Sequence, residues 1–151
     1  MIERRTADSL TAALAAVGLL IAGYLTALHY YSSVPLVCSA GSLVNCETVL
    51  TSPSATVAGL PVAVWGLVWF GVAVTLSAIV LVRDGVGGGG VRTALLAWTV
   101  AATVGVLYLV YQEVGVIGKI CLWCTALHAI ILAMLILESA TYSEYRRSPA
   151  R

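Results

Sequence analysis

Long stretches without charge constrain the fold of this chain more than any other feature of its sequence. Charged residues make up 10% of the 151 residues and hydrophobic residues 60%, whereas about 25% of the residues in an average soluble domain are charged. The charged residues gather in short groups that leave four apolar spans, and about 20 apolar residues are enough for a helix to cross a bilayer. We therefore predict an all-α membrane protein, a four-transmembrane-helix bundle forming a single domain over residues 1–151, with helices at about 8–31, 60–82, 91–113 and 119–140.

The first predicted helix is a retained membrane span, because its apolar run is longer than the roughly 7 to 15 residues of a signal-peptide hydrophobic region. Thr6 or Asp8 is its expected N-cap. Gly18 and Gly23 permit the close approach of a neighbouring helix. The glycine-rich segment at residues 85–90 is expected to be a flexible connector, since it lacks the preceding strand and the following Lys-Ser/Thr of a phosphate-binding loop.

A long polar loop at residues 32–59 connects the first two predicted helices and contains Cys38 and Cys46. Loops longer than about 12 to 15 residues are usually functional or disordered. Residues 41–50 carry enough apolar side chains for a short helix on the membrane surface. We expect the loop to cap the bundle, with Pro61 in the first turn of the second helix.

Basic residues predict the orientation of the bundle. Seven of the eight Lys and Arg residues fall on the side of the two termini and the connection between the second and third helices, and Lys119 alone falls on the other. The positive-inside rule makes the first side cytoplasmic. We expect a multi-pass protein of the cell (plasma or inner) membrane with cytoplasmic termini and an extracytoplasmic loop, and the net charge of +1 gives no reason to expect nucleic-acid binding.

A Cys-x-x-Cys pair, Cys121 and Cys124, opens the last apolar span. Residues three apart share one face of a helix, within reach of a disulfide. The partial positive charge of a helix N-terminus stabilises a thiolate, so Cys121 is expected to be the more reactive sulfur. The alternative is that both cysteines are small apolar residues in a packed helix. Disulfides persist outside the cytoplasm, which is the side predicted for all four cysteines.

His128 follows Cys121 and Cys124 on the same helical face, about 10 Å deeper than Cys121. An ionisable residue inside a membrane span is costly and indicates function. His128 is a candidate to hydrogen-bond a quinone carbonyl or to carry a proton, and the alternative is a neutral histidine bonded to a neighbouring helix. Trp65 is equally compatible with the aromatic belt at the membrane interface and with the wall of a pocket.

Four cysteines are also compatible with two other kinds of site, a zinc site and a pair of structural disulfides. A zinc site is disfavoured because the spacing of Cys38 and Cys46 exceeds the two to four residues typical of such sites. Two purely structural disulfides are the stronger alternative, although they would not explain why one pair stands above a histidine on a membrane span.

Four motifs follow one another along the spans: Cys38 and Cys46 with seven residues between them, Ser52 six positions later, Gly59-Leu60-Pro61, and Cys121-Leu122-Trp123-Cys124. As an ordered set they resemble the vitamin K epoxide reductase family on its bacterial or archaeal side, over nearly the whole chain. The resemblance implies a four-helix bundle around a quinone pocket, coupled to the oxidation of a secreted thioredoxin-like protein.

By position, the resemblance implies that Cys38 exchanges with the reduced partner, Cys46 relays to Cys121, and Cys124 faces the quinone. Ser52 would help to hold the loop or the quinone site. Which of Cys38 and Cys121 bonds Cys46 at rest stays open.

Two positions depart from the animal members of the family, which have an Asn before the glycine of the second helix and a Tyr four residues after the second helix cysteine. Ala55 and His128 stand there in this chain. Together with Ser52 and Trp65, they are the candidate quinone-binding residues. Many bacterial relatives carry a fused thioredoxin-like domain, and since this chain stops at Arg151 we expect the redox partner to be a separate protein.

These observations predict a membrane thiol-disulfide oxidoreductase. Electrons would pass from a DsbA-like partner through Cys38/Cys46 to Cys121/Cys124 and on to menaquinone or ubiquinone. No metal is expected to take part. This transfer would oxidise the partner and so support disulfide bond formation. The alternatives are an enzyme that recycles a quinone or vitamin K epoxide, and a non-catalytic membrane scaffold stapled by disulfides.

Overall fold

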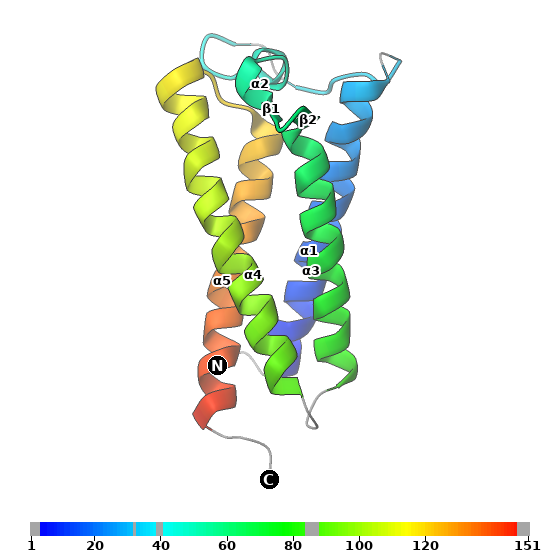
Figure 1. The fold of residues 1–151 in the computed structure, drawn as a ribbon, viewed down its shortest axis with the longest axis vertical. Helices are drawn as coiled ribbons and strands as arrows, with labels where there is room; N and C mark the ends of the chain where they lie inside the picture. The colour runs from blue at the N-terminus through cyan, green and yellow to red at the C-terminus, as the bar shows by residue number, and fades with distance from the viewer. Residues whose placement is uncertain (1–3, 32, 39–40, 84–87, 148–151) are drawn as a thin grey trace.

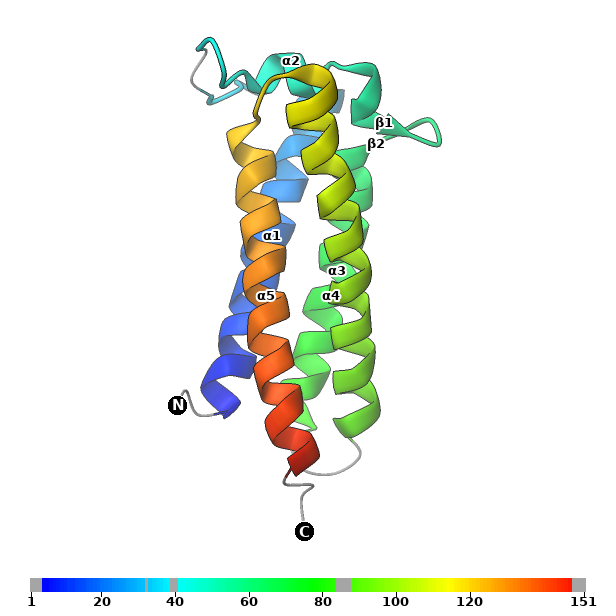
Figure 2. The same ribbon diagram turned by 90° about the vertical axis from the view of Figure 1, so that its left-hand side faces the viewer.

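Four long helices stand side by side in the computed structural model, which describes residues 4–31, 33–38, 41–83 and 88–147. These helices are α1 (Arg4–Tyr30), α3 (Val62–Val82), α4 (Gly88–Tyr111) and α5 (Leu122–Arg147). Within the described residues, each is long and apolar enough to cross a membrane. The start of α1 and the end of α5 lie at one end of the bundle, and the connection between α1 and α3 covers the other (Figures 1 and 2). The predicted four-helix membrane bundle is confirmed.

The connection between α1 and α3 folds into a cap, as predicted for the loop at residues 32–59. It contains the helix α2 (Cys46–Leu50), a 3-10 turn η1 (Pro53–Ala55) and a hairpin of the strands β1 (Thr56–Val57) and β2 (Leu60–Pro61). The helix expected over residues 41–50 is confined to α2, because the Asn45 side chain caps it by accepting a hydrogen bond from the Thr48 N–H at 3.0 Å.

The hairpin also corrects the predicted start of the second membrane helix. Leu60 and Pro61 pair with β1, and α3 begins only at Val62. The two residues of the turn, Ala58 and Gly59, have φ values of 54° and 79°. Positive φ at both central residues is what a type I′ hairpin turn requires.

Helix α4 continues into a π-helical segment, η2 (Gln112–Ile117), so this span runs past the predicted end at residue 113. Gly118 ends it with a φ of 67°, and the carbonyl of Glu113 accepts the N–H groups of Gly118 and Lys119. Gly118 therefore ends this span. It lies one residue before the predicted start of the last helix at residue 119.

The remaining helix boundaries differ from the predictions at the polar ends. Helix α5 runs past the predicted end at residue 140 to Arg147, and Arg146 and Arg147 lie in its last turn, where cations interact favourably with the helix dipole. Helix α4 begins at Gly88, and the part of the predicted 85–90 connector before it lies outside the described residues.

The centre of the bundle is a small-residue core into which one aromatic ring is inserted. Its buried members are Ala15, Ala22, Phe70, Ala73, Val106, Ile131 and Met134. Gly18 lies directly against Phe70, and a Cβ atom on Gly18 would come within 2.1 Å of Phe70 Cε1. The predicted close approach at Gly18 is confirmed, and it brings α1 onto α3.

A buried ion pair joins α1 to α4 near the end that carries the termini. Both terminal guanidinium nitrogens of Arg92 donate to the Asp8 carboxylate, with Nη1 at 2.8 Å from Oδ1. The side chains are each 8% exposed. The expectation that Thr6 or Asp8 caps the first helix was wrong, since both lie inside α1, which begins at Arg4.

We expect Gly18→Ala to lower the free energy of unfolding by about 1–3 kcal/mol, because the new methyl group overlaps the Phe70 ring. Gly71→Ala is the matched control, since no atom lies within 4 Å of a Cβ there. It should leave stability equal or higher. Thermal unfolding of the two variants in detergent measures both effects, and equal stability would contradict the packing.

We expect Asp8→Ala to cost about 3–5 kcal/mol, because it leaves a guanidinium buried without its carboxylate. The double variant Asp8→Ala/Arg92→Ala should lose less than the sum of the two single variants. Arg83→Ala, at an exposed site on the same end of the bundle, should have little effect. Additive losses in the double-mutant cycle would show that the ion pair carries no coupling energy.

Candidate functional site

All four cysteines meet where the cap contacts the start of α5. Cys46 and Cys121 are 1% and 0% exposed and form one buried cluster with Val49. Cys38 and Cys124 are partly buried and pack against that cluster. The structure therefore brings together the loop pair and the helix pair that the sequence placed more than 70 residues apart.

Cys38 and Cys46 form a disulfide, with their Cα atoms 6.1 Å apart, while Cys121 and Cys124 are free thiols. Of the two pairings of Cys46 left open by the sequence, the structure has the one within the loop. This combination is an oxidised loop pair next to a reduced helix pair.

The cap is attached to α5 by hydrogen bonds on both sides of the cysteines. Val44 and Ile120 form a short parallel bridge, in which the Asn45 N–H donates to the Ile120 carbonyl at 3.1 Å and the Ile120 N–H donates to the Leu43 carbonyl at 3.0 Å. The Trp123 indole N–H donates to the Val37 carbonyl at 2.8 Å. The residues that directly precede Cys38 and Cys46, which are Val37 and Asn45, are thus both hydrogen-bonded to the start of α5 or to the residues just before it.

Tyr24, near the end of α1, supports the same segment from the other side. Its hydroxyl donates to the Pro35 carbonyl at 2.8 Å and accepts from the Val37 N–H at 3.1 Å. The Tyr24 ring also meets the Trp123 ring edge-on, with centroids 5.2 Å apart. This contact could not be predicted from the sequence, because it joins three segments distant in the chain.

Cys121 is the N-cap of α5, which corrects the prediction that the helix begins at residue 119. Its carbonyl accepts the first helical hydrogen bond, from Thr125 N–H at 2.9 Å, and its sulfur accepts the Cys124 N–H at 3.4 Å. The pKa of the Cys121 thiol lies below its ordinary value, chiefly because the Cys124 thiol hydrogen-bonds its sulfur, although burial opposes the shift. A lowered pKa favours the reactive thiolate, as expected for Cys121.

Glu113 is a member of the site that the sequence analysis missed. It is 6% exposed, and its Oε2 atom accepts the Cys121 N–H at 3.4 Å. Its carboxyl group also hydrogen-bonds the Cys124 thiol. The predicted helix over residues 91–113 ends at Glu113, whereas η2 carries the helix past it. A carboxylate within an apolar span was the available signal.

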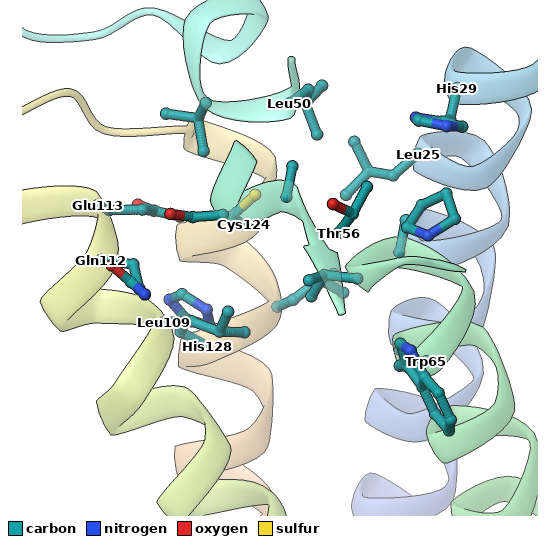
Figure 3. A pocket seen from close by; sticks show the side chains of 18 of the residues that line it. Leu25, His29, Leu50, Thr56, Trp65, Leu109, Gln112, Glu113, Cys124 and His128 are labelled. Carbon is teal, nitrogen blue, oxygen red and sulfur yellow. The ribbon is translucent and has the colours of Figure 1, made fainter. Parts of the chain in front are cut away.

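A cavity of about 1010 Å³ opens beneath the cap and reaches down between the helices. Apolar side chains make up most of its wall, and Phe70, Val106 and Ile131 of the central core contribute to its floor. Cys124 and Glu113 lie at its upper edge, and Gln112 and His128 face one another just below them (Figure 3). Polar groups are therefore gathered on the side of α4 and α5.

The four candidate quinone-binding residues all line this cavity, but they do so differently. His128 is buried one helical turn below Cys124, and no hydrogen bond joins its ring to another residue of the described chain. The Ser52 hydroxyl donates to the Val49 carbonyl at 2.8 Å, and Ala55 ends η1. The Trp65 indole donates to the Val57 carbonyl at 3.2 Å, which braces the hairpin. Only His128 offers a side-chain donor with no partner of its own.

The size and chemistry of the cavity fit a quinone. Its volume accommodates a ring with part of an apolar tail, and binding sites of this kind combine an apolar wall with a few placed polar groups. No group of three or more His, Cys, Asp or Glu residues within the described ranges is arranged to hold a metal ion.

We expect Cys124→Ala to raise the pKa of Cys121, because it removes the hydrogen bond that does most to lower that pKa. A higher pKa means less Cys121 thiolate at neutral pH. In Cys124→Ser, the matched control, the hydroxyl can still donate to the sulfur. The ultraviolet absorbance of the thiolate should therefore titrate at a higher pH in Cys124→Ala than in Cys124→Ser, and equal midpoints would rule out this cause.

Comparison with known proteins agrees with the motifs and the fold. A search of curated proteins finds no match. The model of the vitamin K epoxide reductase family matches residues 9–139, which include α3, α4, the whole cap and all four cysteines. The resemblance seen in the ordered motifs is thereby confirmed. The chain belongs to the vitamin K epoxide reductase family, whose members are membrane oxidoreductases.

Proposed function

We propose that this protein is a quinone-dependent thiol-disulfide oxidoreductase that oxidises a separate thioredoxin-like protein outside the cytoplasm. The observation that carries the proposal is the meeting of two cysteine pairs in one cluster, with the second pair at the edge of an apolar cavity. Two adjacent pairs can exchange two electrons through a mixed disulfide. The cavity supplies a place for the electron acceptor.

The first step takes place at Cys38. Cys38 is partly exposed whereas Cys46 is buried, so a thiolate of the reduced partner reaches the sulfur of Cys38. Attack there forms a mixed disulfide and releases Cys46 as a thiolate. The second thiol of the partner then displaces Cys38, which leaves the partner oxidised and the loop pair reduced.

The second step moves the electrons inward. Cys46 and Cys121 share one buried cluster, so the Cys46 thiolate attacks Cys121 of an oxidised helix pair and releases Cys124. Cys38 then attacks Cys46, which restores the loop disulfide and leaves the helix pair reduced. An oxidised loop and a reduced helix pair are the combination found in the structure.

The third step oxidises the helix pair. A membrane quinone such as menaquinone or ubiquinone is the substrate that accepts two electrons and two protons. Cys124 lines the cavity and Cys121 lies behind it. We assign His128 as the polar contact for this substrate, Trp65 and Ala55 as parts of the wall, and Ser52 as a residue that holds the cap.

The distribution of basic residues supports an orientation with the cap outside the cytoplasm. The helix ends far from the cap carry most of the described basic residues, including Arg4, Arg83, Arg92, Arg146 and Arg147. Lys119 lies beside the cap, where it donates to the Ser42 carbonyl. The positive-inside rule then makes the capped end extracytoplasmic, where disulfides persist.

The relay predicts different losses with two electron donors. Cys38→Ala/Cys46→Ala should abolish quinone reduction by a reduced thioredoxin-like protein but retain reduction by a small dithiol, because the dithiol can reach Cys124 through the cavity. Cys124→Ala should reduce turnover with either donor to the rate measured without enzyme. Spectroscopic assay of quinone reduction by the purified protein measures all four rates.

Ser143→Ala, at an exposed site near the far end of α5, is the control and should keep both activities. Undiminished turnover in Cys124→Ala would eliminate the assigned electron path. Equal loss with both donors in the loop variant would contradict the order of the relay. A wild-type protein that reduces no quinone with any donor would favour a scaffold role.

A further inference from the structure

Glu113 is a buried carboxyl group whose hydrogen bonds go to the helix cysteine pair. Its Oε2 atom accepts the backbone N–H of Cys121 at 3.4 Å, and its carboxyl group hydrogen-bonds the Cys124 thiol. Figure 3 shows Glu113 extending from the start of η2 toward Cys124, with the cavity below. No other carboxyl group in the described ranges contacts these two residues. The ion pair of Asp8 and Arg92 lies at the other end of the bundle, so it does not account for the burial of Glu113.

Two groups that can carry a negative charge already accept hydrogen bonds at the start of α5. The Cys121 sulfur accepts the Cys124 N–H, and the Glu113 carboxylate accepts the Cys121 N–H. A helix N-terminus supplies the equivalent of roughly half a positive charge. It can therefore stabilise about one negative charge in this cluster, and not simultaneous negative charges on Glu113, Cys121 and Cys124.

Titratable groups around the cavity are few. Within the described chain they are His29 of α1, Glu47 of α2, Glu113 of η2, and Cys124 and His128 of α5, with Cys121 directly behind. No Lys or Arg is among the described residues of the wall, and Lys119 donates to the Ser42 carbonyl. A new negative charge at Cys124 thus has no cation beside it, so its formation requires that another negative charge be neutralised.

We propose that the Glu113 carboxylate accepts the proton of the Cys124 thiol when the helix pair is oxidised. This role rests on the proposed function. The S–H bond of Cys124 breaks as an O–H bond forms on Glu113, and the Cys124 sulfur joins the sulfur of the Cys121 thiolate in a disulfide. Two electrons pass to the quinone in the cavity, and the proton on Glu113 follows them to the reduced acceptor. The second proton of the reduced acceptor comes from water and balances the proton that Cys121 released when it became a thiolate. The Cys124 proton moves by one contact, and the negative charge of the cluster does not increase.

The same carboxyl group serves the reverse change at the helix pair. When the Cys46 thiolate opens the Cys121–Cys124 disulfide at Cys121, Cys124 leaves as a thiolate. Before this step Glu113 takes up one of the two protons that oxidation of the partner dithiol releases, and it returns that proton to Cys124, so S–H replaces the lost S–S bond at Cys124. Glu113 therefore exchanges one proton with Cys124 in both steps and is restored at the end of each cycle.

Alkylation of Cys124 tests this role without a quinone. In a Cys121→Ser background with the loop disulfide intact, Cys124 is the single free thiol, and iodoacetamide labelling followed by mass spectrometry gives its rate at each pH. A proton shared between Glu113 and Cys124 keeps a constant thiolate fraction across neutral pH, so the rate should be level there. In Glu113→Gln, which keeps the size and an acceptor for the Cys121 N–H, the rate should rise about tenfold per pH unit instead.

Glu144→Gln is the control, because it removes an exposed carboxylate at the far end of α5, and it should keep the level region. A parent profile without a level region would overturn the proposal. So would a Glu113→Gln profile that is identical to the parent or only displaced along the pH axis, since that is the effect of a distant charge. If Glu113→Gln does not fold, Glu113→Asp should lower the level rate by withdrawing the carboxyl group, and an unchanged rate would again overturn the role.

Quinone reduction separates this inference from the function on which it rests. With both helix cysteines present, Glu113→Gln should lower turnover by about 100-fold, which is within the usual contribution of general acid-base catalysis. Wild-type turnover that persists undiminished in Glu113→Gln would defeat the role of Glu113 alone. Absence of wild-type turnover would defeat the proposed function, while the alkylation profile would still decide whether Glu113 shares a proton with Cys124.

Discussion

Two backbone hydrogen bonds at the bridge between Val44 and Ile120 are the constraint on which the site depends. They join the segment that precedes Cys46 to the segment that precedes Cys121. The bonded residues Leu43, Asn45 and Ile120 are one to three positions from the nearest cysteine, so little chain is left to separate the sulfurs. The buried cluster of Cys46, Val49 and Cys121 adds to this contact between the cap and α5, which we call the seam, by removing apolar surface from water.

The seam also explains why the last helix begins where it does. Gly118 turns the chain out of η2, Ile120 is held extended by the bridge, and Cys121 is left as the first residue able to cap α5. Capping by sulfur places the cysteine at the positive end of the helix dipole, outside the regular turns. The electrostatic property of Cys121 is therefore a consequence of how the cap is attached.

The two ends of the bundle hold separate polar clusters. At one end lie the cysteines with Glu113 and His128, and at the other lies the buried pair of Asp8 and Arg92. Between them the core around Phe70 and Met134 is apolar. Buried charge without a partner is costly in a membrane span. Asp8 and Arg92 meet this cost by pairing, and Glu113 meets it by accepting the Cys121 N–H at the helix N-terminus.

The sequence by itself determined the four spans, the capping loop and the two cysteine pairs. Apolar length and local cysteine spacing depend on residues that are close in the chain, so they can be read without knowing the fold. Tertiary structure alone decided that Cys46 pairs with Cys38, that Asp8 meets Arg92 instead of capping its helix, and that Glu113 contacts the helix cysteines. The last two depend on which helices lie side by side, and the contact of Glu113 also depends on a π-helical segment that turns its side chain inward. Hydrophobic periodicity carries no information about either.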